Sequence, residues 1–321
     1  MSLYKYAQTQ VQRLQTISSH LTPSFSTSTK STMVSASTQP SSARPIISFI
    51  GGGNMAEAIL GGLQASGHPG SRLRYSEPLD ERRKYMQTKY PELVGSADNE
   101  AVVEGADVVI LAVKPQVLRN VISSLAPSFL KNPSMLLISI AAGISTKDML
   151  RWLNTDQAVS IVRCMPNTPA LVGEGAVGLY ATQAVSQEQR STTEAIMRAV
   201  AKQVSWVESE ASIDTVTGIS GSGPAYFFLI MEAMQNAGVA AGLTPEDAKA
   251  LTLQTCLGAA RMAQTSEDDL ATLRRKVTSP KGTTEAAIKS LESNGIRKTM
   301  EEAVFAAENR ARELAEELGQ N

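Results

Sequence analysis

The feature that most constrains this chain is a glycine-rich turn between an apolar run and a helical pattern. The run Ile46–Ile50 is typical of a buried strand, residues 51–56 read Gly-Gly-Gly-Asn-Met-Ala, and a helical pattern covers Glu57–Leu63. In such a G-x-G-x-x-A arrangement, Gly51 permits a tight turn and Gly53 lets the backbone approach a pyrophosphate. The free N–H groups of the following helix then bind the anion. The segment therefore predicts a dinucleotide-binding site.

Further segments that look like strands follow at intervals that leave room for helices. They are Leu73–Ser76, Asp107–Val113, Met135–Ile140 and Ala158–Arg163, of which Asp107–Val113 and Met135–Ile140 are continuous apolar runs. Continuous apolar strands that alternate with helices indicate a parallel sheet covered on both faces, and its ligands bind at the carboxyl ends of the strands. We therefore expect an α/β fold, with a Rossmann-like doubly wound sheet domain over residues 46–208. The segments Lys114-Pro115, Ala141-Ala142 and 164–169 should line the cofactor cleft.

The rest of the chain, residues 209–321, has no strand pattern and predicts an all-α domain. A helix is expected to start at Ser222-Gly223-Pro224, and its residues 225–234 are apolar nearly all round, which indicates burial on most sides. Thr244 should cap the N-terminus of the next helix. Because a helical segment of this size is too small to enclose such a helix, we expect an intimate homodimer formed through this domain.

Composition argues against several other classes of protein. The formal net charge is -1, which indicates neither a nucleic-acid partner nor binding to an anionic membrane surface. The two cysteines, Cys164 and Cys256, are far apart and lack the spacing of a metal site, so neither a metal centre nor a disulfide framework is expected. The sequence contains no apolar run long enough to span a bilayer.

The first 45 residues have a different character from the rest. They contain no Asp or Glu and are rich in Ser and Thr, so they should form a disordered extension. A basic, Ser-rich and acid-free segment is also typical of an organelle transit peptide. The alternatives are an extension without a targeting role and a later start at Met33. A cytoplasmic or a mitochondrial location thus remains open, and the extension favours the mitochondrial one.

A second motif lies near the end of the chain. A helical pattern breaks at Pro280-Lys281-Gly282 and resumes at Thr283 or Thr284. Backbone N–H groups at such a helix start can hold a small carboxylate, and the two hydroxyls can reach a nearby ring nitrogen. The alternative is a capping box, in which a threonine caps the helix and Glu285 lies in its first turn. Spacing alone leaves both interpretations open.

From about Ile46 to Leu318 the chain resembles the pyrroline-5-carboxylate reductase family. The blocks that carry the resemblance occur in the family's order: Ala112–Pro115, Ser139–Gly143, Arg163–Pro169, Gly218–Tyr226 and Val277–Glu292. The resemblance implies hydride transfer from NAD(P)H to the C=N bond of 1-pyrroline-5-carboxylate, which yields L-proline. It also implies a helical domain that interlocks with a second subunit, and dimers that assemble further, up to decamers.

The resemblance implies which residues contact the cofactor. The pyrophosphate falls on the glycine-rich turn, formed by Ile50, Gly51, Gly52, Gly53, Asn54 and Met55. The region of a 2′-phosphate falls near Ser76 and Asn99. The nicotinamide end falls on residues that follow later strands and on the start of the helical domain, namely Ala112, Val113, Lys114, Pro115, Ala141, Ala142 and Glu210. No metal is implied.

For the substrate, the resemblance implies that its carboxylate binds to the turn that includes Ser279, Gly282 and Thr283. It gives the contact with the ring nitrogen, and hence the catalytic role, to Thr284. Lys281 stands where the family commonly has glycine.

The choice of cofactor depends on the end of the second strand. Glu77 stands where an acid would accept the ribose 2′-hydroxyl of NAD, whereas Ser76, Arg82, Arg83 and Asn99 together would suit a 2′-phosphate. We expect NADP, as NADPH, and leave NAD open.

Two functions from other classes fit the same domain plan. One is a hydroxyacid dehydrogenase or imine reductase, and the other is a dinucleotide-binding sensor without activity. A hydroxyacid dehydrogenase would need a catalytic lysine on the helical domain, and the intact turn Ser279–Thr284 argues against a sensor.

Overall fold

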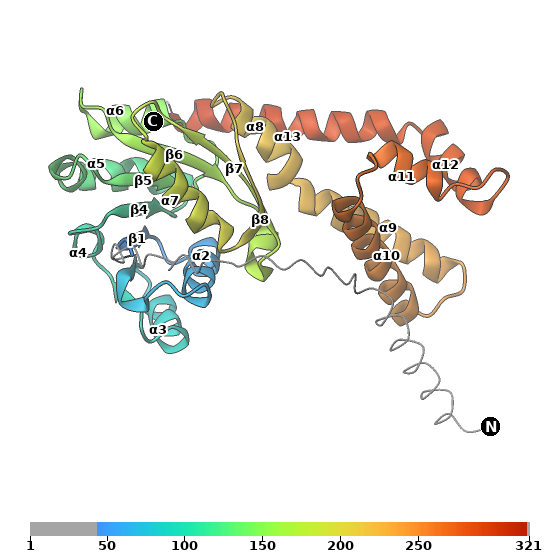
Figure 1. Ribbon diagram of the computed structural model, residues 1–321, viewed down its shortest axis with the longest axis horizontal. Coiled ribbons are helices and arrows are strands. Elements are labelled where there is room, and N and C mark those ends of the chain that lie inside the picture. Colours follow the sequence, from blue (N-terminus) through green and yellow to red (C-terminus); the bar gives the residue numbers. More distant parts are fainter. Residues whose placement is uncertain (1–43, 320–321) are drawn as a thin grey trace, which may run out of the picture. The chain divides into compact units, whose positions relative to one another are not determined.

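The computed structural model describes residues 44–319, in which eight strands form one sheet (Figure 1). The strand order is β3-β2-β1-β4-β5-β6-β7-β8. The strands are β1 (Ile47–Ile50), β2 (Leu73–Ser76), β3 (Val94–Ser96), β4 (Val108–Leu111), β5 (Leu136–Ser139), β6 (Ser160–Met165), β7 (Gly175–Ala181) and β8 (Ala201–Trp206). All pairs from β3 to β6 are parallel, and only β7 runs antiparallel to its neighbour β6. The expected N-terminal extension falls, up to residue 43, outside the described residues.

Helices cover both faces of this sheet. On one face lie α2 (Asn54–Ala65), α3 (Asp80–Lys89) and α7 (Gln187–Arg198), and on the other lie α4 (Asn99–Val103), α5 (Pro115–Lys131) and α6 (Thr146–Leu153). Short turns of helix at η1 (Gly70–Arg72) and η2 (Thr168–Val172) connect other segments.

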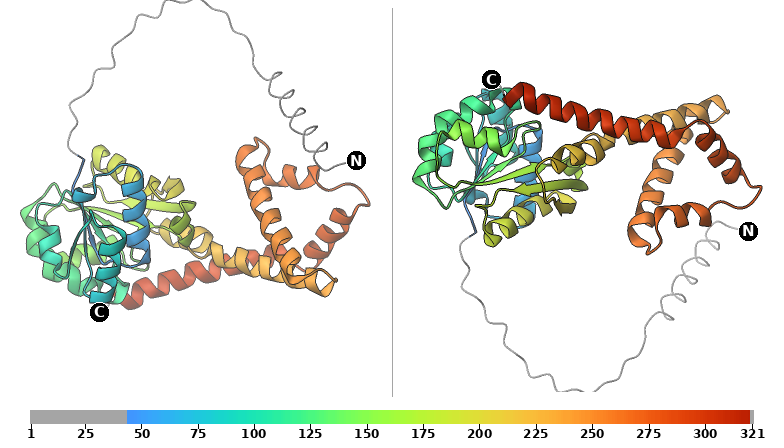
Figure 2. Two further views of the ribbon diagram at one scale, coloured as in Figure 1. Left: turned by 90° about the horizontal axis from the view of Figure 1, so that it is seen from below. Right: turned by 90° about the horizontal axis from the view of Figure 1, so that it is seen from above.

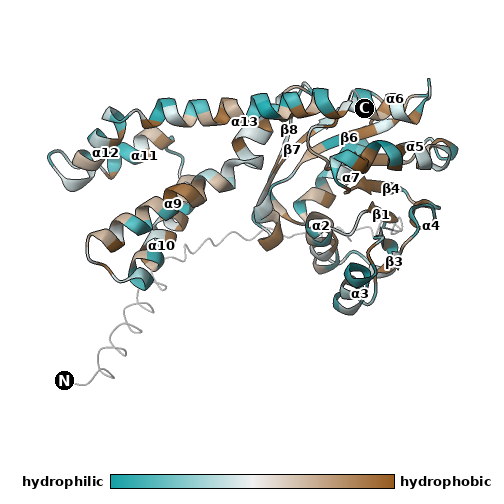
Figure 3. Ribbon diagram, turned by 180° about the vertical axis from the view of Figure 1, so that it is seen from behind, coloured by the Kyte–Doolittle hydropathy of each residue, from teal (hydrophilic) through white to brown (hydrophobic). Residues whose placement is uncertain are grey.

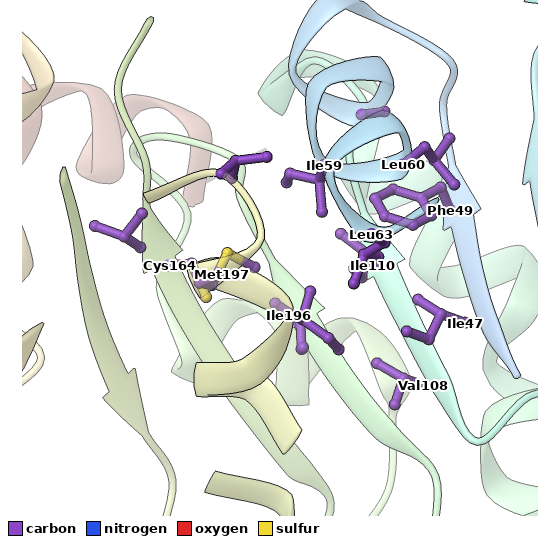
Figure 4. Close-up of a cluster of buried hydrophobic side chains, with 14 of the residues drawn as sticks. Ile47, Phe49, Ile59, Leu60, Leu63, Val108, Ile110, Cys164, Ile196 and Met197 are labelled. Carbon is purple, nitrogen blue, oxygen red and sulfur yellow. The ribbon is translucent and has the colours of Figure 1, made fainter. Parts of the chain in front are cut away.

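The strands alternate their side chains between two apolar cores. Ile47 and Phe49 of β1 belong to the core beneath α2, α3 and α7, part of which Figure 4 shows, and Ile50 belongs to the opposite core. A strand that buries both faces must be apolar throughout. The prediction of a Rossmann-like, doubly wound sheet is therefore confirmed.

Beyond the sheet, the described residues form only helices. They are α8 (Ser212–Val216), the π-helical turn η3 (Thr217–Gly221), α9 (Gly223–Ala240), α10 (Pro245–Thr265), α11 (Leu270–Lys276), α12 (Thr283–Ser293) and α13 (Ile296–Gly319). The predicted cap of α10 is confirmed, because the Thr244 side chain accepts a hydrogen bond from the backbone N–H of Asp247. The long α13 (red in Figure 2) packs against α8 and η3, and its last residue, Gly319, accepts a hydrogen bond from Arg151 on α6.

The helical domain exposes much of its apolar surface. Phe227, Phe228 and Leu229 on α9 are 62%, 64% and 66% exposed, and Leu251 and Leu257 on α10 are also largely exposed. Figure 3 shows the hydrophobic colouring of α9. Adjacent exposed apolar side chains of this size mark an interaction surface, so the isolated chain lacks part of its core. Within residues 44–319, no helix is both long and apolar enough to cross a membrane.

We predict that replacing two apolar side chains of α9, Phe228→Ser with Leu229→Ser, weakens self-association. Each buried side chain of this kind contributes about 1.5–3 kcal/mol, so the dissociation constant should rise by roughly 100-fold or more. Light scattering after size-exclusion chromatography at several concentrations measures the change. The control is Val94→Ser, which removes an exposed apolar side chain from the edge strand β3. Equal masses for the α9 variant and the wild type at every concentration would contradict the prediction.

Candidate active site

The glycine-rich turn lies at the carboxyl ends of three adjacent strands. Gly51 follows β1 with φ +102°, donates its N–H to the carbonyl oxygen of Ser76 at 3.0 Å, and passes so close to β4 that a Cβ would lie 2.8 Å from the Ala112 oxygen. Gly53 precedes α2 without any side-chain cap, and a Cβ there would meet nothing within 4 Å. The first N–H groups of α2 thus lie beside open space, as a bound pyrophosphate requires.

An acidic residue that follows β2, Glu77, contacts the glycine-rich turn. The Glu77 carboxylate accepts hydrogen bonds from the N–H groups of Gly52 at 3.1 Å and Leu79 at 2.9 Å, and the residue is only 8% exposed. Ser76 is fully buried and donates its hydroxyl to the Phe49 carbonyl oxygen at 3.4 Å. Asn99, at the start of α4, is half-buried. Ser76 thus contacts the glycine-rich turn through its backbone carbonyl, and Glu77 contacts it through its side chain.

Arg82 braces the same turn from α3. Its Nε donates to the Gly52 carbonyl oxygen at 2.7 Å, and its Nη2 pairs with Glu57 on α2 at 2.6 Å. Burial raises the pKa of the Glu57 carboxyl, but hydrogen bonds from Lys89, Arg82 and Tyr85 outweigh it and hold that pKa below its usual value. Arg83 donates instead to the Glu77 carbonyl oxygen and pairs with Asp80. Arg82 thus ties α3 to the glycine-rich turn and to α2, and Arg83 holds the β2–α3 connection in place.

The segments after β4 and β5 lie at the same carboxyl edge of the sheet as the glycine-rich turn. Ala112 and Val113 are half-buried, exposed Lys114 precedes α5, and Pro115 is its first residue. After β5, Ala141 is buried and Ala142 is exposed.

Glu210 lies beside this second segment but bonds to the protein itself. Its carboxylate accepts hydrogen bonds from the N–H of Thr146 at 2.6 Å and from the Thr146 hydroxyl at 2.5 Å. Arg163 on β6 lies 3.4 Å from the same carboxylate. Sequence reasoning missed Thr146 and Arg163 as partners of Glu210, because pairs separated by 64 and 47 residues leave no local pattern.

The second motif is a tight turn that joins α11 to α12. Gly282 donates its N–H to the Ser279 carbonyl oxygen at 3.0 Å and precedes α12 without a side-chain cap. Glu285 reaches back to the N–H of Lys281 at 2.7 Å. The capping-box alternative, in which a threonine caps the helix, is therefore wrong. The N–H groups of Thr283 and Thr284 at the helix start lack a partner within the helix, and a small anion suits them.

Within residues 44–319, no hydrogen bond or ion pair joins this turn to the glycine-rich turn or to Ala141-Ala142. The structure thus brings the residues predicted to bind the cofactor together at one edge of the sheet, and it places the residues predicted to bind the substrate on another part of the chain.

Comparison with known proteins decides the family. The model for the pyrroline-5-carboxylate reductase dimerisation domain matches residues 210–314, and that for NADP oxidoreductases of the coenzyme F420-dependent type matches residues 46–143. A pyrroline-5-carboxylate reductase from Pseudomonas aeruginosa is 50% identical over 276 residues, which cover 86% of this chain and 99% of the relative. The chain belongs to the pyrroline-5-carboxylate reductase family.

Solved structures of the family agree with this fold. The reductase from Coxiella burnetii, 45% identical, matches with a TM-score of 0.80 over 85% of this chain and 99% of its own. The reductase from Plasmodium falciparum, with NADP bound, is 30% identical and matches with a TM-score of 0.74 over 85% of this chain and 99% of its own. The sequence-based prediction of the family is thus confirmed.

One residue of the turn before α12 has an unfavourable backbone conformation. Lys281 has φ +58°, in the left-handed region, where the Cβ of a residue other than glycine costs about 1 kcal/mol.

We predict that Lys281→Gly raises the free energy of unfolding by about 0.5–1 kcal/mol, because it removes the Cβ clash and loses only part of that gain to the entropy of the unfolded chain. Lys281→Ala is the matched control, since it removes the charge but keeps the Cβ. Denaturant unfolding at one fixed subunit concentration measures both variants. If alanine stabilised the protein as much as glycine, the side chain and not the backbone would be responsible.

Proposed function

We propose that this protein reduces 1-pyrroline-5-carboxylate to L-proline with NADPH, the last step of proline biosynthesis. The observation that carries the proposal is the pair of anion-binding helix starts: Gly53 before α2 for a pyrophosphate, and Gly282 before α12 for a small carboxylate. A sensor of dinucleotides would need only the first. The family relationship supplies the substrate and the reaction.

In this reaction the chain orients its reactants. Bound NADPH supplies the hydride. The N–H groups of Thr283 and Thr284 bind the substrate carboxylate, and the Thr284 hydroxyl oxygen accepts a hydrogen bond from the protonated ring nitrogen. Because a protonated C=N bond is already electrophilic, the main task of the protein is to hold the acceptor carbon at about 3–3.5 Å from the donor carbon. The segments Ala112–Pro115 and Ala141-Ala142 support the nicotinamide end.

The substrate turn of one subunit completes the active site at the cofactor cleft of its partner. This arrangement accounts for the lack of polar contacts between the two motifs within one chain, and for the exposed apolar helices that need a partner. The working unit is a homodimer formed through the helical domain, and such dimers assemble into a decamer. The acid-free extension before residue 46 directs the protein to mitochondria.

The test of the function is oxidation of NADPH, followed by its absorbance, with purified protein and 1-pyrroline-5-carboxylate, then with NADH. Turnover that yields L-proline supports the proposal. Binding of NADPH without turnover of 1-pyrroline-5-carboxylate would discard it in favour of a sensor. Reduction of NADP⁺ with 3-hydroxyacids, without turnover of 1-pyrroline-5-carboxylate, would favour a hydroxyacid dehydrogenase.

We predict that Thr284→Ala lowers kcat/KM by roughly 10- to 100-fold, since it removes a hydrogen bond to the reacting ring. Thr284→Ser keeps the hydroxyl and should retain most of the rate. Steady-state kinetics with saturating NADPH separate the two variants. Unchanged kcat/KM in the alanine variant would exclude a role for this hydroxyl.

We predict that Glu77→Gln shifts the preference towards NADPH, raising the ratio of kcat/KM for NADPH to that for NADH by about tenfold. A 2′-phosphate beside the glycine-rich turn would lie within a few ångströms of the Glu77 carboxylate, and like charges at such distances repel by about 1–4 kcal/mol. The control is Glu81→Gln, which removes the same charge from an exposed position on α3. An equal shift in both variants would show a general charge effect instead.

A further inference from the structure

A buried ionic cluster connects the sheet domain to the first residues of the helical domain. Arg163 on β6, with its side chain 4% exposed, lies between Glu210 at 3.4 Å and Asp214 at 3.3 Å. Burial raises the pKa of the Asp214 carboxyl, and the positive charge of Arg163 opposes that rise. Because the Arg163 cation faces two carboxylates, the cluster holds Glu210 in a defined place. The carboxylate of Glu210 is thereby directed towards the start of α6.

At that start, Glu210 occupies the anion-binding position of a helix. Thr146 is the first residue of α6, so its N–H has no partner within the helix. Both the N–H and the hydroxyl of Thr146 donate to Glu210, and Thr146 is 5% exposed. The N–H and the hydroxyl hydrogen of Thr146 are therefore both bound to the Glu210 carboxylate.

The turn that Thr146 terminates is held on its other side as well. Gly143, with φ +71°, lies against α13, and a Cβ there would lie 3.3 Å from that of Leu314. Arg151, later in α6, donates to the carbonyl oxygen of Gly319 at the end of α13. The beginning and the end of the helical domain thus both contact the β5–α6 turn, and Ala142 is its exposed residue.

We infer that Glu210 is a positioning residue that acts through Thr146. The bonds to Thr146 fix the β5–α6 turn, and through Ala141 and Ala142 they set the depth at which the nicotinamide ring lies in the cleft. This inference rests on the proposed function, because it assigns the turn to the nicotinamide end. Hydride transfer is steeply sensitive to such placement, since a displacement of about 1 Å can lower a rate by about 100-fold.

The test compares Thr146→Val with Thr146→Ser. Valine has the shape of threonine and lacks only the hydroxyl, whereas serine keeps it. We expect Thr146→Val to lower kcat by about tenfold with the Kd for NADPH changed by less than about threefold, because the ring is misplaced while the pyrophosphate site stays intact. Thr146→Ser should restore most of the rate. Nicotinamide fluorescence measures the Kd.

A second measurement does not depend on turnover. Hydrogen exchange of residues 141–146 should be faster in Thr146→Val than in Thr146→Ser and the wild type, while exchange in β4 should be the same in all three. Equal kcat in the two variants, or a fall in NADPH affinity that matches the fall in rate, would overturn the inference. If the wild type did not turn over 1-pyrroline-5-carboxylate, the proposed function would fail, and unchanged exchange in Thr146→Val would then separately overturn the connection through Thr146.

Discussion

The close approach of the Gly51 backbone to the end of β4 is the contact on which the cleft depends. A Cβ at Gly51 would lie 2.8 Å from the Ala112 oxygen, so only glycine lets the chain turn this close to the ends of β2 and β4. The N–H of Gly51 is taken by Ser76 and that of Gly52 by Glu77, so the turn is tied to β2 by two hydrogen bonds. The N-terminus of α2 is then left facing open space, where we propose that a pyrophosphate binds.

The helical domain meets a different constraint. Its helices bury few apolar side chains within one chain, and Phe227, Phe228 and Leu229 of α9 stay exposed. A domain that buries so little surface cannot offset the entropy of ordering its chain. Self-association supplies the missing core, and the match of residues 210–314 to a dimerisation domain agrees with this physical argument.

Sequence reasoning located β1, β2, β4, β5 and β6 and missed β3, β7 and β8. Strands β1, β4 and β5 read as continuous apolar runs because helices cover both of their faces. In contrast, β3 has three residues, β7 is interrupted by glycines, and β8, at the edge of the sheet, buries only Ala201 and Val204. Ser76 was expected near a 2′-phosphate, but its hydroxyl bonds within the sheet. Whether a strand side chain faces other parts of the fold or a ligand depends on which elements cover each face of the sheet. The sequence alone does not specify those elements.

The polar contacts of the site were less predictable than its backbone, for the same reason. Glycine motifs encode turn geometry locally, so both the turn after β1 and the break before α12 could be placed to within a residue or two. The bond between Thr146 and Glu210 joins residues 64 positions apart and exists only after the two domains have packed. At Lys281 the local backbone preference and the hydrogen bonds of the turn oppose each other. Its φ of +58° is unfavourable for any residue but glycine, yet the bonds of its N–H to Glu285 and of the Gly282 N–H to Ser279 fix the turn. The strain at Lys281 is therefore offset by hydrogen bonds that hold the turn before α12 in one conformation.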